Sequence, residues 1–317
     1  MTSKNVAIIG GSGFVGSKLC KIFDNKKTPY SVHDVIETGD KYLDVEKIST
    51  FNLPENTEII INLAAIHHDD VKPISRYDDV NIEGAKNICK FASLNSINRI
   101  IFTSSVAIYG FAPPNTDENG KPNYFNDYGR TKYEAEKVFK DWQKKESDKR
   151  SLIIIRPTVI FGEGNRGNVY NLLKQIQSKR FVMIGKGDNK KSMAYVENVA
   201  EFIDHCTTFS SGIHIYNYVD KPDLDMNNLV AISREFLFGK NSTGIRIPAA
   251  LGLFIGHLAD IFTKVTRKKI PISSIRVKKF LGTTQFNSSY KKTGFSPSTP
   301  IDEALKKTLN HEFKSKI

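Results

Sequence analysis

Short runs that are apolar at every position alternate, in the first half of the chain, with longer segments whose apolar residues recur at helical spacing. The predicted strands are 6–9, 31–35, 58–63, 99–103 and 152–155, and the predicted helices include 14–23, 81–94 and 128–145. A strand that is apolar throughout is covered on both faces, as in the parallel sheets of α/β proteins. The pattern therefore predicts an α/β fold with a doubly wound parallel sheet.

The regular alternation of predicted strands and helices ends after Gly162, where the polar, glycine-rich stretch 162–168 predicts a loop. Beyond this loop the sequence predicts helices mixed with short strands, at 169–177, 181–184, 196–206, 213–218 and 226–238. We interpret 1–165 as a first domain and 166–317 as a smaller, mixed substrate lobe. The two are expected to be partly interleaved, with some of the later strands returning to the main sheet.

The chain carries 46 Lys and Arg against 34 Asp and Glu, a net charge of +12. Its 39% hydrophobic and 25% charged residues exclude a disordered or collagen-like chain. Charge alone does not choose among partners, and since no nucleic-acid-reading module is recognised, we expect no nucleic-acid partner. Three distant cysteines predict no disulfide framework, and the N-terminus lacks a signal-peptide pattern, so we expect a cytoplasmic protein.

A glycine-rich turn follows the first predicted strand and opens the first helix. Gly10, Gly13 and Gly16 stand in the sequence GGSGFVG, with Phe14 and Val15 between the last two glycines. The backbone of such a turn approaches a pyrophosphate closely, and the helix N-terminus supplies unpaired N–H groups. The strand–turn–helix context therefore predicts a dinucleotide site of the Rossmann type at these residues.

Asp34 follows the second predicted strand at the distance expected of a ribose-binding carboxylate. A carboxylate there accepts from the ribose 2′-hydroxyl and repels a 2′-phosphate, so we predict NAD rather than NADP. The alternative is a solvated acid in a turn. Further cofactor contacts are predicted where later segments meet the same edge of the sheet, at Asp44, Val45, Leu63, Ala64 and Ala65.

Tyr128 and Lys132 stand four residues apart in the sequence YGRTK and share one face of the predicted helix. A free tyrosine has a pKa of ~10, but a nearby ammonium and a positive nicotinamide ring favour the phenolate. Tyr128 is therefore a candidate general base toward a substrate hydroxyl. A serine after strand 99–103 would complete the site, and we favour Ser105 over Ser104; the alternative is a pair of turn serines.

These motifs follow one another in a single order, as GGSGFVG, Asp34, LAA, TSSVAIYG, YGRTK and RPTVIFG. In this combination the chain resembles the extended short-chain dehydrogenase/reductase family, in its NAD-dependent epimerase/dehydratase branch, over essentially its whole length. The resemblance implies an NAD-dependent enzyme whose catalytic residues are Ser105, Tyr128 and Lys132. It also implies a cofactor contact at Pro157, and Asn81 fits a helix motif of the family.

Other stretches resemble bacterial enzymes of surface-polysaccharide (O-antigen) assembly, namely HHDDVKP, RPTVIFGEGNRGNVYNLLKQI, KSMAYVENV, YNYVDKPDL and SSIRVKKF. This resemblance implies that N-acetylglucosamine (GlcNAc) is converted to N-acetylgalactosamine (GalNAc) at C4 while it is carried on undecaprenyl diphosphate. Nucleotide-sugar members of the family carry an arginine where Lys191 stands, and the two are not equivalent as phosphate partners. Substrate contacts are predicted at His67, Ser105, Asn168, Lys191, Arg276 and Lys278.

Other functions remain open. A UDP-GlcNAc or UDP-hexose 4-epimerase would use the same chemistry, and a nucleotide-sugar 4-keto reductase or 4,6-dehydratase would use a related site. A dehydratase needs an acid–base pair beside the serine, which Val106 and Ala107 do not offer. A sensor that binds NAD without catalysis is disfavoured by the intact trio of serine, tyrosine and lysine. No metal is predicted, because the spacing of the HHDD stretch at 67–70 fits no zinc pattern.

Segment 248–262 predicts an amphipathic helix, too short to span a membrane, whose apolar face holds Leu251, Phe254, Ile255, Leu258, Ile261 and Phe262. Lys264, Arg267, Lys268 and Lys269 follow it, and no Asp or Glu occurs from 261 to 301. An apolar face beside basic residues predicts that 248–280 lies on an anionic membrane, peripheral to the cytoplasmic face of the inner membrane. The alternative is a helix packed inside the second lobe. We also expect a homodimer.

Overall fold

The computed structural model describes residues 5–68, 71–266 and 273–314, which form two compact units. Unit 1 consists of Met1–Ile160, Ala194–Val219 and Phe286–Thr299, and unit 2 consists of Phe161–Met193, Asp220–Gln285 and Pro300–Ile317. Two segments beyond the predicted division at residue 165 therefore belong to unit 1. One of them, Ala194–Val219, supplies a strand to the sheet of unit 1 and a helix that packs on this sheet.

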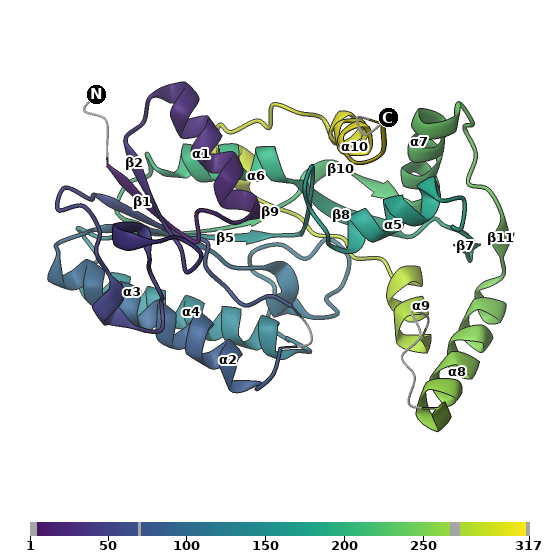
Figure 1. Ribbon diagram of the computed structural model, residues 1–317, viewed down its shortest axis with the longest axis horizontal. Coiled ribbons are helices and arrows are strands. Elements are labelled where there is room, and N and C mark those ends of the chain that lie inside the picture. Colours follow the sequence, from purple (N-terminus) through teal and green to yellow (C-terminus); the bar gives the residue numbers. More distant parts are fainter. Residues whose placement is uncertain (1–4, 69–70, 267–272, 315–317) are drawn as a thin grey trace. The chain divides into compact units, whose positions relative to one another are not determined.

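Unit 1 is built on a six-stranded sheet in the order β2-β1-β3-β4-β5-β9, in which every neighbouring pair is parallel (Figure 1). Its strands are β1 Val6–Ile9, β2 Tyr30–His33, β3 Ile59–Asn62, β4 Arg99–Thr103, β5 Ser151–Pro157 and β9 Gly212–Tyr218. Every residue of β1, β3 and β5 is buried, which explains their uninterrupted apolar runs. The predicted doubly wound sheet is confirmed. Its strand order reverses between β1 and β3, where dinucleotides bind in such folds.

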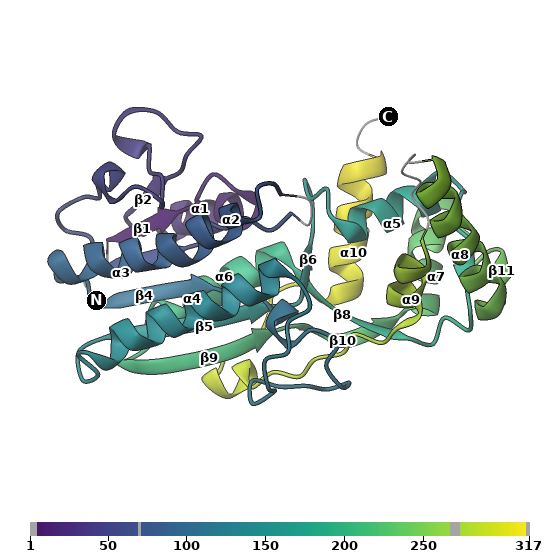
Figure 2. The same cartoon turned by 90° about the horizontal axis from the view of Figure 1, so that it is seen from below.

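Helices cover both faces of this sheet (Figures 1 and 2). Helices α3 and α4 pack against Ile60 and Ile100, whereas α1 and α6 pack against Ile61 and Ile101. Alternate residues of one strand thus serve two separate hydrophobic cores. The helices of unit 1 are α1 Phe14–Lys26, α2 Ser75–Tyr77, α3 Gly84–Leu94, α4 Asp127–Lys144 and α6 Val196–Cys206, and Asp78–Glu83 form a π-helical turn between α2 and α3.

Unit 2 contains shorter strands and more separate helices. One sheet has the order β10-β8-β6, and β11 pairs with β7. The strands are β6 Val159–Phe161, β7 Met183–Ile184, β8 Lys190–Tyr195, β10 Asp220–Asp225 and β11 Arg246–Ile247. The helices are α5 Asn168–Gln177, α7 Met226–Phe238, α8 Ala249–Thr266, α9 Ser274–Leu281 and α10 Ile301–Leu309. The helix predicted at 248–262 corresponds to α8, which extends to Thr266, and α9 lies at the end of the predicted basic segment 248–280.

Candidate active site

The turn between β1 and α1 leaves no room for a side chain at Gly10. Gly10 has φ +79°, and a Cβ atom placed on it would lie 2.6 Å from the Ala64 backbone nitrogen. Gly13 caps α1 without any side-chain hydrogen bond, so no side chain competes for the N–H groups of the first turn. A close backbone approach and a helix N-terminus free of side-chain caps fit the pyrophosphate of a dinucleotide, as the sequence predicts.

Two carboxylates lie beside this turn. Asp34 accepts a hydrogen bond from the Ser12 backbone N–H at 3.2 Å, and the Ser12 hydroxyl donates to Glu37 Oε1 at 2.6 Å. Asp34 was predicted, but Glu37 was not, because nothing in its spacing distinguishes it from a solvated loop residue. Both carboxylates are placed to disfavour a 2′-phosphate, which agrees with the predicted use of NAD.

The other predicted cofactor residues surround the same edge of the sheet. Leu63 donates its N–H to Ile9 O at 2.8 Å, which holds the Leu63–Ala65 backbone beside the glycine turn. The Asp44 carboxylate accepts from Glu46 N at 3.1 Å. Val45 is buried in the hydrophobic core, so its side chain serves packing. Pro157 ends β5, opposite Tyr218 of β9.

Helix α4 brings the predicted tyrosine and lysine to the site. Asn126 starts the helix by accepting from Gly129 N at 2.9 Å. A Cβ atom on Gly129 would lie 2.5 Å from Ala107 O, so only glycine lets α4 pack this closely against the turn after β4. The glycine of the YGRTK motif thus brings Tyr128 next to the serines of that turn.

The structure distinguishes the two candidate serines. Ser105 forms a hydrogen bond with the Tyr128 hydroxyl. Its Oγ also accepts from Ala107 N at 3.1 Å. Ser104 instead donates to Glu136 Oε1 at 2.7 Å and is almost fully buried. Ser105 therefore joins Tyr128, whereas Ser104 belongs to a network behind the site.

Burial sets the protonation of the tyrosine and the lysine. Desolvation raises the pKa of Tyr128, although the hydrogen bond with Ser105 opposes the shift. Desolvation lowers the pKa of Lys132 from 10.5 to about 7, against the opposing effect of Glu136. The Lys132 ammonium lies 4.5 Å from the centre of the Phe102 ring. Burial thus favours the neutral form of each group, and the expectation that a charged lysine and a nicotinamide ring favour the phenolate stays a prediction.

A buried ionic network supports the catalytic face of α4, and the sequence-based prediction missed it. Arg156 donates to both carboxylate oxygens of Glu136, at 2.8 and 2.6 Å, and to the Tyr109 hydroxyl at 2.6 Å. Glu136 stands one turn beyond Lys132, so the spacing of residues 128, 132 and 136 on one helix face was the available signal. Paired in this way, Glu136 keeps its pKa lowered despite its burial.

Asn81 links the loop after β3 to α4. Its amide accepts from Ile66 N at 3.0 Å and donates to Thr131 Oγ1 at 2.9 Å. His67 follows in the same loop, and its pKa is lowered mainly by burial, with smaller effects of His68 and Lys132. Thus Asn81 fixes the segment that carries His67, a predicted substrate residue of unit 1.

The remaining predicted substrate residues lie in unit 2. The Lys191 ammonium donates to the carbonyl oxygens of Lys279, at 2.9 Å, and Gly282, and burial lowers its pKa to about 8. It thereby caps the C-terminus of α9. Arg276 and Lys278 are exposed on α9, and Asn168 is the exposed first residue of α5. Contact of Lys191, Arg276 and Lys278 with a diphosphate, and of Asn168 with the substrate, remains a prediction.

Within residues 5–68, 71–266 and 273–314, no three His, Cys, Asp or Glu side chains gather where they could hold a metal ion. The rings of His67 and His68 lie with their centres 4.2 Å apart and are tilted by 34°. The other two residues of the HHDD stretch, Asp69 and Asp70, lie outside the described residues.

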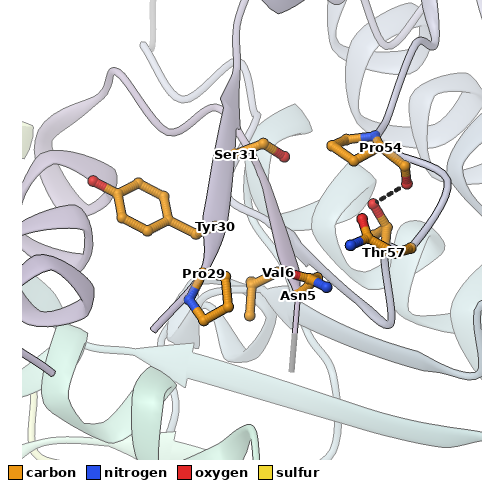
Figure 3. A pocket seen from close by; sticks show the side chains of 8 residues that line it. Asn5, Val6, Pro29, Tyr30, Ser31, Pro54 and Thr57 are labelled. Atoms are coloured by element: carbon orange, nitrogen blue, oxygen red, sulfur yellow. Dashed lines mark hydrogen bonds between the residues drawn. The ribbon is translucent and has the colours of Figure 1, made fainter. Parts of the chain in front are cut away.

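A small hollow lies at the opposite edge of the sheet, beside the first residues of β1 and β2 (Figure 3). Its lining includes Val6, Tyr30 and Ser31, together with Thr57, which donates to Pro54 O at 2.6 Å. Ligands of doubly wound sheets bind beyond the carboxyl ends of the strands. This hollow therefore lies apart from the glycine turn and the catalytic residues.

The fold and the glycine turn are those of a dinucleotide-dependent enzyme, and the serine that meets Tyr128 follows β4 at the same edge of the sheet as the glycine turn. The sequence model of the NAD dependent epimerase/dehydratase family matches residues 6–218. The chain belongs to this family, and the predicted dependence on NAD is thereby confirmed.

Two relatives of this chain are named as 4-epimerases. The chain is 44% identical to N-acetyl-α-D-glucosaminyl-diphospho-ditrans,octacis-undecaprenol 4-epimerase of Escherichia coli O157:H7, over 98% of this chain and 95% of the relative. It is 27% identical to UDP-glucose 4-epimerase of Vibrio cholerae, over 96% of this chain and 94% of the relative. Both relatives are 4-epimerases and both match over nearly their whole length.

Solved structures share the fold. UDP-N-acetylglucosamine 4-epimerase from Bacillus cereus superposes with a TM-score of 0.75 at 15% identity, covering 97% of this chain and 98% of that one. The complex of Thermus thermophilus UDP-glucose 4-epimerase with NAD superposes with a TM-score of 0.71 at 16% identity, covering 97% and 98%. At identities this low, the similarity to these solved structures shows only that the fold is shared.

Proposed function

We propose that this enzyme inverts C4 of GlcNAc carried on polyprenyl diphosphate and produces the GalNAc form, in the assembly of a bacterial surface polysaccharide. The observation that carries the proposal is the 44% identity, over 98% of this chain, to an epimerase named for this lipid-linked sugar. Ser105 beside Tyr128, with Lys132 one turn further along the same helix, would supply the chemistry that such an inversion requires.

The chain's own residues handle the proton of the C4 hydroxyl. Tyr128 takes this proton as general base, and the Ser105 hydroxyl donates a hydrogen bond to the reacting oxygen. Bound NAD would supply the chemistry of a reversible hydride acceptor at C4. The 4-keto sugar would turn within the site so that its opposite face receives the hydride, and Tyr128 would return the proton to the C4 oxygen, which leaves C4 inverted. The overall reaction is an isomerisation without net oxidation.

Lys132 would act on the protonation of Tyr128 and on the cofactor. Its lowered pKa shows an ammonium that burial leaves poorly solvated and that Glu136 only partly compensates. Hydroxyls of a bound nicotinamide ribose would supply hydrogen-bond partners to such a group. Binding of NAD would then favour the charged lysine, and the charged lysine would favour the phenolate of Tyr128.

A second candidate is a 4-epimerase of UDP-GlcNAc or another UDP-hexose, which the 27% identity to UDP-glucose 4-epimerase of Vibrio cholerae favours. Lys191 argues against this candidate, because the nucleotide-sugar enzymes that the sequence resembles carry an arginine at this position. Lysine cannot form the bidentate contact that arginine makes with phosphate.

The proposal places the enzyme at the cytoplasmic face of the inner membrane. A polyprenyl chain is buried in a bilayer, so an enzyme that acts on its diphosphate headgroup must work at the bilayer surface. We also propose a homodimer, in keeping with the sequence-based expectation.

The substrate is tested by supplying two sugars separately to the purified enzyme with NAD. Polyprenyl-diphosphate GlcNAc should be converted to the GalNAc form, detected by mass spectrometry after release and chromatography of the sugar, whereas UDP-GlcNAc should remain unchanged. Conversion of UDP-GlcNAc alone would overturn the proposed substrate and leave the 4-epimerase chemistry in place.

Tyr128→Phe tests the catalytic assignment. Loss of the phenolic hydroxyl should reduce kcat at least ~100-fold, because general acid–base catalysis contributes ~10²–10⁴-fold. Tyr133→Phe, on the same helix, is the matched control and should keep full activity. Equal activity of the Tyr128 variant and the control would remove Tyr128 from the mechanism.

A further inference from the structure

Helix α8 (Ala249–Thr266) of unit 2 packs through small residues. A Cβ atom on Gly252 would collide with the Ile184 side chain, and one on Gly256 would lie 2.9 Å from Ser274 Cα. Ala259 is the third buried residue of the helix. The face that α8 turns toward β7 and α9 is therefore nearly flat and offers little apolar area to the core.

The large apolar side chains of α8 point away from this packed face. Their exposed fractions are 46% for Leu251, 60% for Phe254, 39% for Ile255, 50% for Leu258, 59% for Ile261, 48% for Phe262 and 77% for Val265. At 100° per residue these seven positions occupy one uninterrupted arc of about 120°. A core helix would be oriented the other way, so the predicted alternative of a helix buried in the second lobe is wrong.

Length does not decide how this helix meets a membrane. Among the described residues, α8 is the one helix with the length and apolar composition of a membrane-spanning segment. The expectation that the segment is too short to span is therefore not supported. A spanning orientation would, however, separate Gly252 and Gly256 from the residues they contact in unit 2. These contacts favour a helix that lies along the surface.

Basic residues stand on α8 and on α9, the helix packed against it. Lys264 stands on α8 just before Val265, and Lys278 and Lys279 are exposed on α9. No Asp or Glu occurs from 261 to 301, and Asp260 is engaged in accepting from Ser274 N at 3.1 Å. Three further basic residues, Arg267, Lys268 and Lys269, are present in the sequence but lie outside the described residues.

We propose that the exposed apolar face of α8, together with the basic residues of α8 and α9, docks the enzyme on a bilayer of anionic lipid. The apolar side chains enter the boundary between headgroups and acyl chains, and the lysines meet the lipid phosphates. A second copy of the chain is a poorer occupant, because pairing through this face brings like charges together. The docking rests on the proposed function, since it holds the enzyme where a polyprenyl diphosphate is found.

Vesicle flotation of the full chain tests the docking. The protein should float with vesicles of phosphatidylglycerol and phosphatidylethanolamine, remain unbound with phosphatidylcholine alone, and dissociate as NaCl is raised, because surface charge is screened by salt. Phe254→Ser with Leu258→Ser should lower the bound fraction about tenfold or more. Leu94→Ser with Ile245→Ser is the matched control, since Leu94 is 72% and Ile245 71% exposed outside α8.

Several outcomes would overturn the docking. Two such outcomes are equal binding to both kinds of vesicle and unchanged binding of the α8 variant. A third is a native protein that binds no vesicle and is a dimer, when the α8 variant is a monomer and the control variant is still a dimer. Flotation requires no catalysis, so the Tyr128→Phe protein should float like the native enzyme. Both serine double variants should retain epimerase activity on a short, water-soluble carrier, which separates failure of docking from failure of the proposed function.

Discussion

At the residue scale, the site is dominated by desolvated groups. The pKa of Tyr128 is raised and that of Lys132 is lowered to about 7, so each side chain is driven toward its neutral form. A neutral tyrosine is a weaker base than its phenolate, and a neutral lysine does not stabilise that phenolate electrostatically. We therefore expect binding of the cofactor, which brings a positive nicotinamide ring, to favour the phenolate of Tyr128.

Lys132→Met should stabilise the cofactor-free protein while abolishing epimerisation. The folded-state pKa of Lys132, about 7, lies below its ordinary value of 10.5, so folding is penalised in full below pH 7. The penalty decreases as pH rises from about 7 to about 10.5. Thermal unfolding at pH 6 should therefore show a gain on the order of 2 kcal/mol for the variant, and the gain should shrink at pH 9.

Lys144→Met is the control for this measurement, because Lys144 is exposed near the end of the same helix. Its effect should be small at both pH values. A Lys132 variant that is less stable than the native protein at pH 6 would contradict the desolvation argument and would assign the lysine a structural role.

At the element scale, two glycine-dependent contacts assemble the site. The turn after β1 packs on Ala64, and α4 packs through Gly129 against Ala107 O. Both contacts bring backbone against backbone, so they fix the position of whole elements. Asn81 then ties the loop after β3 to α4 through Thr131. The cofactor site and the catalytic residues are thereby positioned by secondary-structure elements rather than by mobile side chains.

Gly10→Ala should abolish NAD binding, as measured by isothermal titration calorimetry. Its Cβ atom would be forced to 2.6 Å from Ala64 N, in addition to the strain of φ +79°. Gly39→Ala is the matched control, because Gly39 has φ +60° but no atom within 4 Å of an added Cβ. The control should lose about 1 kcal/mol of stability and keep its affinity for NAD. Equal loss of NAD binding in both variants would attribute the effect to backbone strain alone.

At the scale of the whole molecule, the order of the sequence does not follow the division into units. Strand β9 pairs with β5 along its whole length, and α6 forms one wall of the core that Phe23 and Ile153 share. Both elements come from Ala194–Val219, well beyond the polar loop at 162–168. Unit 1 therefore depends on chain that follows the first part of unit 2.

A fragment of residues 1–165 should not fold. It would lack β9 and α6, leaving the β5 edge unpaired and the apolar residues of one sheet face uncovered. Circular dichroism should show no cooperative thermal transition, and NAD should not raise its Tm, whereas NAD should raise the Tm of the full chain. A cooperative, NAD-stabilised fragment would show that the first 165 residues form an autonomous domain.

The sequence by itself determined the parallel sheet, the glycine turn, Asp34 and the Tyr128–Lys132 pair, because each depends on local spacing within one strand, turn or helix. Only the tertiary structure decided between Ser104 and Ser105, placed Glu37 beside Ser12, and joined Glu136 to Arg156. These contacts link residues that are distant along the chain or indistinguishable by type. The outward face of α8 also required the structure, since periodicity identifies an apolar face without showing whether protein covers it.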